Sequence, residues 1–183
     1  MSAVSLIRSG KRLATTMALC LALVASSTIQ PETASATDST PSLLTSYVIS
    51  NRVFDLINSE RAAHYLPALH RNSYLNWTAY KHDVKMAQYN TMWHQLPGEL
   101  SLGDRMRAAG YNWRAAGENI AWNYDWTLAG AYFLEQYMYN EKAPYDSHRL
   151  AILGTAYRDV GVYIYMDAAH HKMWLTVDFG LHM

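Results

Sequence analysis

Four residues of the chain have side chains suited to binding a metal ion or transferring a proton: His94, Glu118, Glu141 and His148. Each lies in an expected loop or at the end of an expected element, where functional sites are commonly built. Neutral imidazole donates an electron pair to zinc or a similar divalent ion, and a carboxylate either binds the ion or orients the imidazole. The four residues therefore predict a metal-binding cleft, with His94 and His148 as the metal ligands.

Two functions are compatible with such a cleft. In a binding module, it would hold a divalent metal ion such as zinc and an extended ligand (a lipid, a glycan or a peptide) without a reaction. In a metal-dependent hydrolase, a peptidase or an esterase, Glu118 or Glu141 would act as general base towards water. A catalytic zinc usually has three protein ligands, whereas this chain offers two credible imidazoles. We therefore expect binding, with no catalytic residue.

Simpler roles for the four residues remain open at this point. Glu118 could cap a backbone group or pair with Arg114, and Glu141 could belong to a solvated helix end. His94 could be an exposed loop residue, and His148 an ordinary residue in the first turn of a short helix. Common catalytic motifs do not decide the matter, because the chain contains no H-E-x-x-H, G-x-S-x-G or Walker sequence.

Other histidines are interpreted without a functional role. His82 falls on the core-facing side of an expected helix and is interpreted as a packing residue. His170 and His171 are adjacent in an expected hairpin loop and are interpreted as part of a solvated turn. The predicted site therefore draws on His94 and His148 alone among the histidines.

The first 36 residues have the layout of a secretory signal peptide. Basic residues at 8–12 precede an uncharged apolar run at 13–27, and the small residues 34–36 form a cleavage pattern. The run is shorter than the roughly 20 residues of a spanning helix, which makes an uncleaved anchor the less favoured alternative. We expect a secreted, extracellular protein with a signal peptide at 1–36, a linker at 37–46 and one domain at 47–183.

The composition of the expected mature part excludes several kinds of partner. Three of the 15 Lys and Arg residues and one of the 15 Asp and Glu residues fall within 1–36, which leaves a formal charge of −2. No basic field is present for nucleic acid, and no Lys/Arg run for an anionic membrane. We expect a monomer with no nucleic-acid partner and no stable membrane insertion after cleavage. The single cysteine, Cys20, lies in the signal segment, so the domain folds without disulfides, which favours a bacterial origin.

The hydrophobic pattern places helices first and strands last. Periodicity and breaks predict helices at 46–63, 73–91, 102–109, 126–140 and 147–153, with an extended piece at 115–121. Ser73 and Asp125 are the expected N-caps of the second and fourth helices, and Leu56 and Ile57 are the expected core positions of the first. Alternation over 160–166 and 173–179 predicts a β-hairpin with Val160, Val162 and Ile164 on one face. Helices followed by antiparallel strands indicate an α+β fold.

Several segments occur in an order that is typical of one family. They are "LINSERAAHYLPAL", "LNWTAYKHDVKMA", "WHQ", "RMRAAGYNWRAAGENIA", "NEKAPYDSHRLAIL", "DVGVYIY" and "WLTVDFG". Together they resemble the bacterial, cysteine-poor branch of the CAP superfamily. This superfamily comprises the cysteine-rich secretory, antigen 5 and pathogenesis-related proteins, which are also called SCP-like. The resemblance covers about residues 53–180, and "GENIA" is its most specific part.

The resemblance implies a three-layer α-β-α sandwich, with a small antiparallel sheet between helices and a large cleft centred on two His and two Glu. It places Glu118 at the Glu of the family's G-E-N motif and His94 at the His of its "SH" segment. His148 stands at the His of "GHRANIL", written here as "SHRLAIL", and Glu141 at the Glu of a W-x-x-E helix end. It also implies that Gly117 lets the chain turn close to the cleft wall.

The chain departs from the family pattern at three of these positions. Met138 replaces the Trp of W-x-x-E, Ser147 the Gly before the second His, and Ala151 the Asn of "RANIL". Members of the superfamily are associated with sterol, lipid and glycan binding and with interactions with hosts or competitors, and proteolysis has also been proposed for them. The resemblance therefore leaves both functions open.

Overall fold

The computed structural model describes residues 43–183, so the predicted signal peptide and most of the predicted linker lie outside the described residues. Helix α1 (Leu43–Ala63) begins inside the segment 37–46 that we expected to be a linker. Ser46, in its first turn, is already buried, and its C=O accepts a hydrogen bond from Ser50 Oγ at 2.7 Å. None of the helices in this part of the chain combines the length and the apolar character needed to span a bilayer.

Within residues 43–183, a four-stranded sheet has the order β1-β3-β4-β2. The strands are β1 (His70–Arg71), β2 (Trp113–Asn123), β3 (Asp159–Asp167) and β4 (Lys172–His182). β3 and β4 form the predicted antiparallel hairpin, and β2 pairs antiparallel with the other side of β4. β1 pairs parallel with the start of β3. It was not predicted because two residues are too few to show an alternating pattern.

Side chains complete the outer edge of β3. β1 reaches only as far as Val160. Val162 is the next residue of β3 whose backbone groups point away from β4. Arg71 Nη2 donates to the C=O of Val162 at 3.0 Å, and the Val162 N–H donates to Asn76 Oδ1 at 2.9 Å. These contacts satisfy backbone groups that a neighbouring strand would otherwise bind.

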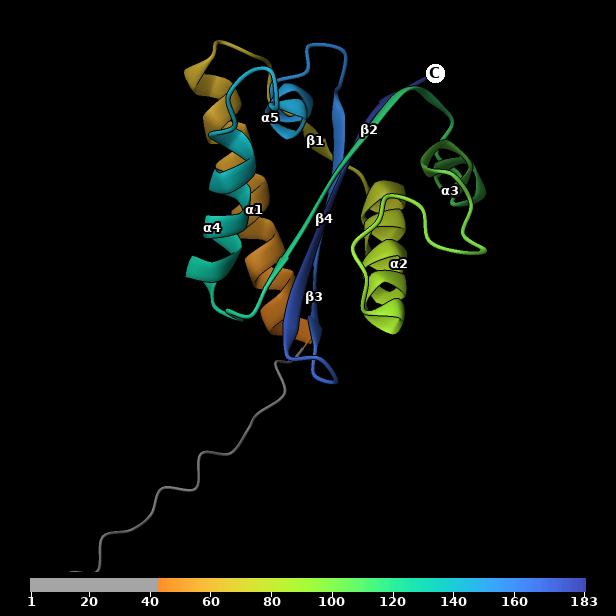
Figure 1. The fold of residues 1–183 in the computed structure, drawn as a ribbon. Helices are drawn as coiled ribbons and strands as arrows, with labels where there is room; N and C mark the ends of the chain where they lie inside the picture. The colour runs from red at the N-terminus through yellow and green to blue at the C-terminus, as the bar shows by residue number, and fades with distance from the viewer. Residues whose placement is uncertain (1–42) are drawn as a thin grey trace, which may run out of the picture. The chain divides into compact units, whose positions relative to one another are not determined.

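Helices cover both faces of the sheet, as the predicted three-layer sandwich requires (Figure 1). α1, α4 (Leu128–Tyr139) and α5 (Ser147–Ile152) lie on one face. α2 (Ser73–Tyr89) and α3 (Leu102–Ala108) lie on the other. The fold thus confirms the expected α+β class.

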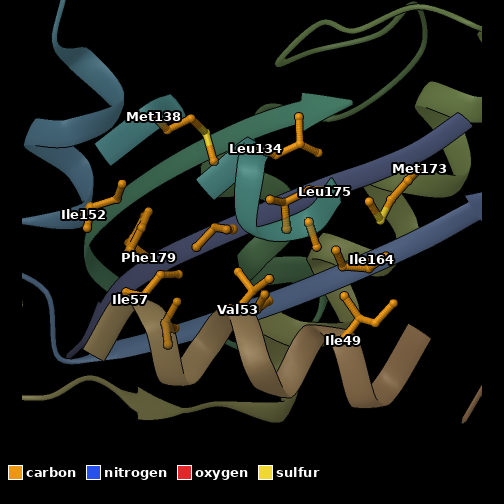
Figure 2. Packing of buried hydrophobic residues seen from close by; sticks show 14 of the residues in the cluster. Ile49, Val53, Ile57, Leu134, Met138, Ile152, Ile164, Met173, Leu175 and Phe179 are labelled. Atoms are coloured by element: carbon orange, nitrogen blue, oxygen red, sulfur yellow. The ribbon is translucent and has the colours of Figure 1, made fainter. Parts of the chain in front are cut away.

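The larger hydrophobic core lies between the sheet and α1 with α4 (Figure 2). Val53 and Ile57 of α1 are fully buried against it. The face of β3 that we predicted from alternation points into this core, because Val160, Val162 and Ile164 are at most 1% exposed. The alternation therefore identified the correct side of the strand.

Three local predictions were wrong. The N-cap of α2 is Asn72, whose side chain accepts two backbone N–H groups, rather than Ser73. The N-cap of α4 is Thr127 rather than Asp125, so this helix begins two residues later than expected. Leu56, which we expected in the core, is only half-buried. The two cap errors are shifts of one or two residues, which the hydrophobic pattern alone does not resolve.

Two buried carboxyl groups lie on α1 and α4. Glu60 is 5% exposed and accepts a hydrogen bond from the Gln136 side chain, and the fully buried Glu135 shares a side-chain hydrogen bond with Glu60. Burial raises the pKa of Glu60 to about 7. Burial, reinforced by the nearby charge of Glu60, raises the pKa of Glu135 well above its usual range. Burial at both positions therefore favours the neutral acid over the carboxylate.

The first prediction is that the domain becomes less stable as the pH rises from about 5 to about 8. A carboxyl group whose pKa is higher in the folded state stabilises the fold fully below its unfolded pKa, which is 4.5 for Glu60. That contribution is lost as the pH rises through the folded pKa near 7. A shift of this size corresponds to at most about 3 kcal/mol. Urea denaturation at several pH values measures the effect.

Glu60→Gln should flatten this pH dependence, since an amide does not ionise but still accepts the bond from Gln136. Asp55→Asn removes an exposed carboxylate from the same helix and should leave the dependence in place. A wild-type protein whose unfolding free energy stays level over this pH range would contradict the prediction.

Candidate functional site

His94 and Glu118 form the first His–Glu pair. His94 lies in the loop after α2, and Glu118 lies near the middle of β2. His94 Nδ1 is 2.9 Å from Glu118 Oε1. The side chain of His94 is 59% exposed and that of Glu118 only 2% exposed. A buried carboxylate thus orients an imidazole that solvent reaches.

Glu141 and His148 form the second pair. Glu141 follows α4, and His148 lies in the first turn of α5. His148 Nδ1 is 2.6 Å from Glu141 Oε1, and the His148 backbone N–H donates to Glu141 Oε2 at 3.0 Å. Glu141 therefore binds a free N–H at the start of α5, which Asp146 at the N-cap position does not bind.

Asn119 connects the two pairs through β2. Its buried side chain donates through Nδ2 to the C=O of His148 at 3.0 Å. Successive side chains of a strand point to opposite faces, so Glu118 and Asn119 reach the two pairs from opposite faces of β2. β2 is an edge strand of the sheet. All four predicted residues are therefore attached, directly or through Asn119, to one short stretch of this edge.

Both histidine rings are oriented by a carboxylate. In both pairs Nδ1 faces a carboxylate, which leaves Nε2 available to a metal ion. No group of three or more His, Cys, Asp or Glu side chains within residues 43–183 is arranged to hold a metal ion.

The other oxygen of Glu118 contacts Arg105, a residue that the sequence pattern had not singled out. Arg105, on α3, is 7% exposed at its side chain and donates through Nη2 to Glu118 Oε2. Its Nη1 lies 3.0 Å from Glu99 Oε1 and also contacts His82. The alternative pairing of Glu118 with Arg114 is not formed, because Arg114 is exposed on β2.

Electrostatics keep this buried cluster charged. Burial alone would lower the pKa of Arg105, but the nearby carboxylates, Glu118 first, raise it above its usual value. Burial also opposes the ionisation of Glu99, yet hydrogen bonds from His82 and a backbone N–H lower its pKa to about 2. Arg105 and Glu99 are therefore both ionised at neutral pH.

Two further carboxyl groups lie next to this cluster. Asp178, opposite Glu118 on β4, and Asp83, on α2, are fully buried. Thr78 Oγ1 donates to Asp178, and Thr176 Oγ1 donates to Asp83. Burial raises the pKa of both acids well above the usual range, and the charge of Glu118 raises that of Asp178 further. Both shifts favour the neutral form of the buried acid over a carboxylate next to other carboxyl groups.

A signal for Arg105 is present in the helical periodicity. Leu102, Arg105, Met106 and Ala109 recur at three- and four-residue steps, and Met106 is fully buried. A cation on the apolar side of a helix indicates a buried ion pair, because unpaired arginine is almost never buried. The periodicity does not identify the partner, Glu118, because Glu118 lies on β2, after the turn that follows α3.

The other histidines have roles close to their interpretation. His82 is fully buried, but it belongs to the polar cluster, where its Nε2 has no hydrogen-bond partner among the described residues. His170 Nδ1 is 2.7 Å from Asp167 in the β3–β4 turn. His171 stacks on Trp126 with ring centroids 4.5 Å apart.

Gly117 has a different role from the expected turn. It lies in regular strand, opposite Phe179 of β4. A Cβ at this position would lie 2.5 Å from the Tyr157 hydroxyl. Position 117 therefore has no room for a larger side chain, because Tyr157 packs against the strand there.

The family model of the cysteine-rich secretory protein family, CAP, matches residues 54–179, which include both His–Glu pairs. The chain belongs to this family. The match confirms the resemblance of the sequence motifs and assigns the α-β-α sandwich to the CAP fold.

Solved structures of other CAP-like proteins share the fold. An extracellular protein containing an SCP domain from Bacillus anthracis is 27% identical, with a TM-score of 0.63. The match covers 74% of this chain but 41% of the Bacillus protein, so this chain spans less than half of that length. A comparison with curated proteins found no significant match.

Two more distant structures support the fold alone. An outer surface protein from Borrelia burgdorferi is 18% identical, with a TM-score of 0.64, and the match covers 74% of this chain and 94% of that protein. NaASP2 with Zn²⁺ is 12% identical, with a TM-score of 0.53, and the match covers 78% and 82% of the two chains. The CAP domain therefore has neighbours described as extracellular or outer-surface proteins.

Proposed function

We propose that this CAP domain is a secreted binding module. A divalent metal ion such as zinc binds at the edge of β2 through His94 and His148, which reach this edge from its two faces, and an extended ligand lies across the same surface. Glu118 and Glu141 orient the two rings. The observation that carries the proposal is that both imidazoles have Nδ1 on a carboxylate, so that Nε2 of each ring remains for a metal.

The carboxylates support binding over hydrolysis. A general base needs an oxygen that can take a proton from water. Both oxygens of Glu118 are engaged, one by His94 and one by Arg105. Both oxygens of Glu141 are engaged by His148. Each carboxylate thus binds neighbouring groups through both oxygens, and taking up a proton would disrupt these contacts.

Exposed aromatic rings next to the pairs support an extended ligand. Trp93, which precedes His94, is 58% exposed, and Tyr145, three residues before His148, is 85% exposed. Such rings offer flat apolar faces to a lipid chain, a sugar ring or a peptide side chain. The structure of NaASP2 with Zn²⁺, which shares only the fold with this chain, is consistent with a metal as one component.

The second prediction tests the metal site by calorimetry with Zn²⁺. The wild-type protein should bind the ion near pH 7.5 and bind it more weakly as the pH approaches about 5, because a protonated imidazole does not ligate. His148→Ala should abolish this binding, and Glu141→Gln should weaken it about tenfold or more by loosening the ring. His70→Ala removes an exposed histidine of β1 and serves as the control. Unchanged Zn²⁺ binding in His148→Ala would refute the assignment.

The hydrolase alternative is tested on the same proteins with a panel of peptide and ester substrates. Metal-dependent turnover in the wild type that is lost in Glu118→Gln, while Zn²⁺ still binds, would replace the binding module with an enzyme. We expect no turnover above that of the His148→Ala variant.

A further inference from the structure

A cavity of about 280 Å³ lies between α2 and the segment that leads into α3. Trp77, Lys81 and Lys85 line it from α2, where steps of four residues place them on one face of the helix. Leu100 and Arg105 line it from the loop and from α3. Neither His94 nor His148 lines this cavity, so it is separate from the proposed metal site.

The cavity carries two positive charges that no carboxylate neutralises. In the part of the chain that the structure describes, neither Lys81 nor Lys85 forms an ion pair; Lys81 Nζ lies 5.5 Å from the centre of the Trp77 ring. The one carboxylate at the cavity, Glu99, is already bound by Arg105 and His82. An anion that entered would therefore meet two ammonium groups without a competing carboxylate.

Arg105 adds a buried hydrogen-bond donor. Its terminal nitrogens are bound by Glu99 and Glu118, but its Nε–H is buried and has no acceptor among residues 43–183. A buried donor left without an acceptor costs about 1–3 kcal/mol.

The remaining walls are apolar and open to solvent. Trp77 is 53% exposed and Leu100 is 54% exposed, and Ala108 and Ala109 of α3 complete the lining. An exposed indole face and an exposed leucine side chain favour a flat apolar group between them. The volume lies just below the range of roughly 300–1,000 Å³ that is usual for ligand pockets, which limits the ligand to one or two fused rings.

We propose that this cavity binds a small aromatic carboxylate. The carboxylate lies near Lys81 and Lys85, next to the Arg105 side chain, and the ring lies between Trp77 and Leu100. This assignment rests on the cavity alone and does not depend on the metal site.

The third prediction is tested by calorimetry with 2-naphthoate as the probe. The wild-type protein should bind 2-naphthoate with a dissociation constant below about 1 mM, and it should bind the neutral analogue 2-naphthalenemethanol at least about tenfold more weakly. Lys81→Met and Lys85→Met keep the aliphatic stem but remove the ammonium group, and each should raise the dissociation constant about fivefold or more. Lys142→Met removes an exposed lysine elsewhere and should have no effect.

Three results would overturn the proposal: no binding of 2-naphthoate at 1 mM, equal binding of the neutral analogue, or equal weakening by Lys142→Met. Thermal denaturation of each variant shows whether it is folded. Should one lysine variant unfold, the other variant and the neutral analogue still decide the outcome.

Discussion

Arg105→Met is expected to lower the free energy of unfolding by about 3–5 kcal/mol, the usual effect of removing one partner of a buried ionic cluster. The substitution leaves the Glu118 and Glu99 side chains, each at most 7% exposed, without their cation. Methionine fills much of the volume of the arginine stem. The loss of stability therefore reflects the missing charge rather than a new cavity. Urea denaturation near pH 7 measures the difference.

Arg107→Met is the matched control on the same helix. The Arg107 side chain is half exposed, lies over the Trp113 ring at 4.3 Å and pairs with the exposed Asp104. Exposed pairs of this kind contribute at most about 1 kcal/mol. If the Arg105 and Arg107 variants unfold at the same urea concentration, the cluster does not stabilise the domain as described.

A double variant separates the charge effect from other losses. Arg105→Met combined with Glu118→Gln removes the cation and one of the carboxylates that it neutralises. We expect the double variant to be more stable than Arg105→Met alone, because an uncharged amide is less costly to bury than an unpaired carboxylate. A double variant that is less stable than the single one would indicate that Glu118 contributes through packing and not through its charge.

Gly161→Ala is expected to destabilise the domain by about 3 kcal/mol, at the upper end of the range for overpacking. An added Cβ would lie 2.1 Å from the backbone carbon of Leu75 and 2.3 Å from the backbone nitrogen of Asn76. Backbone atoms cannot rotate away as a side chain can, so α2 would have to move off β3. Thermal denaturation, with circular dichroism to confirm the native fold, tests the expectation.

Gly117→Ala provides the comparison, because its added Cβ would meet a side chain. The nearest atom is the hydroxyl oxygen of Tyr157 at 2.5 Å, at the end of a ring that can tilt. We expect a loss of about 1 kcal/mol, clearly smaller than for Gly161→Ala. Equal losses in the two variants would show that α2 is not held against β3 as closely as the structure indicates.

The arrangement of elements was largely predictable because it depends on local patterns. Alternation identified the hairpin and the buried side of β3, and helical spacing located α2 and α3 to within about two residues. β1 and the helix caps were missed, because each depends on one or two residues whose role is set by tertiary contacts.

The candidate site was predictable in part. Family motifs selected Glu118 and both histidines, and the structure pairs each histidine with a predicted carboxylate. The cluster around Arg105 was not predicted, because its members come from segments that are distant in the sequence. Asp178 illustrates the difficulty: the polar face of an alternating strand usually faces water, but here α2 covers it, and Asp178 is fully buried.

The side-chain bonds at the edge of β3 bear on aggregation. An edge strand with free N–H and C=O groups is a template to which a strand from another molecule can add. At Val162 both groups are already bound, by Arg71 and Asn76. An incoming strand would have to displace these two side chains before it gained its first backbone bonds there. Arg71 and Asn76 therefore act as gatekeepers that oppose growth of the sheet from one molecule into the next.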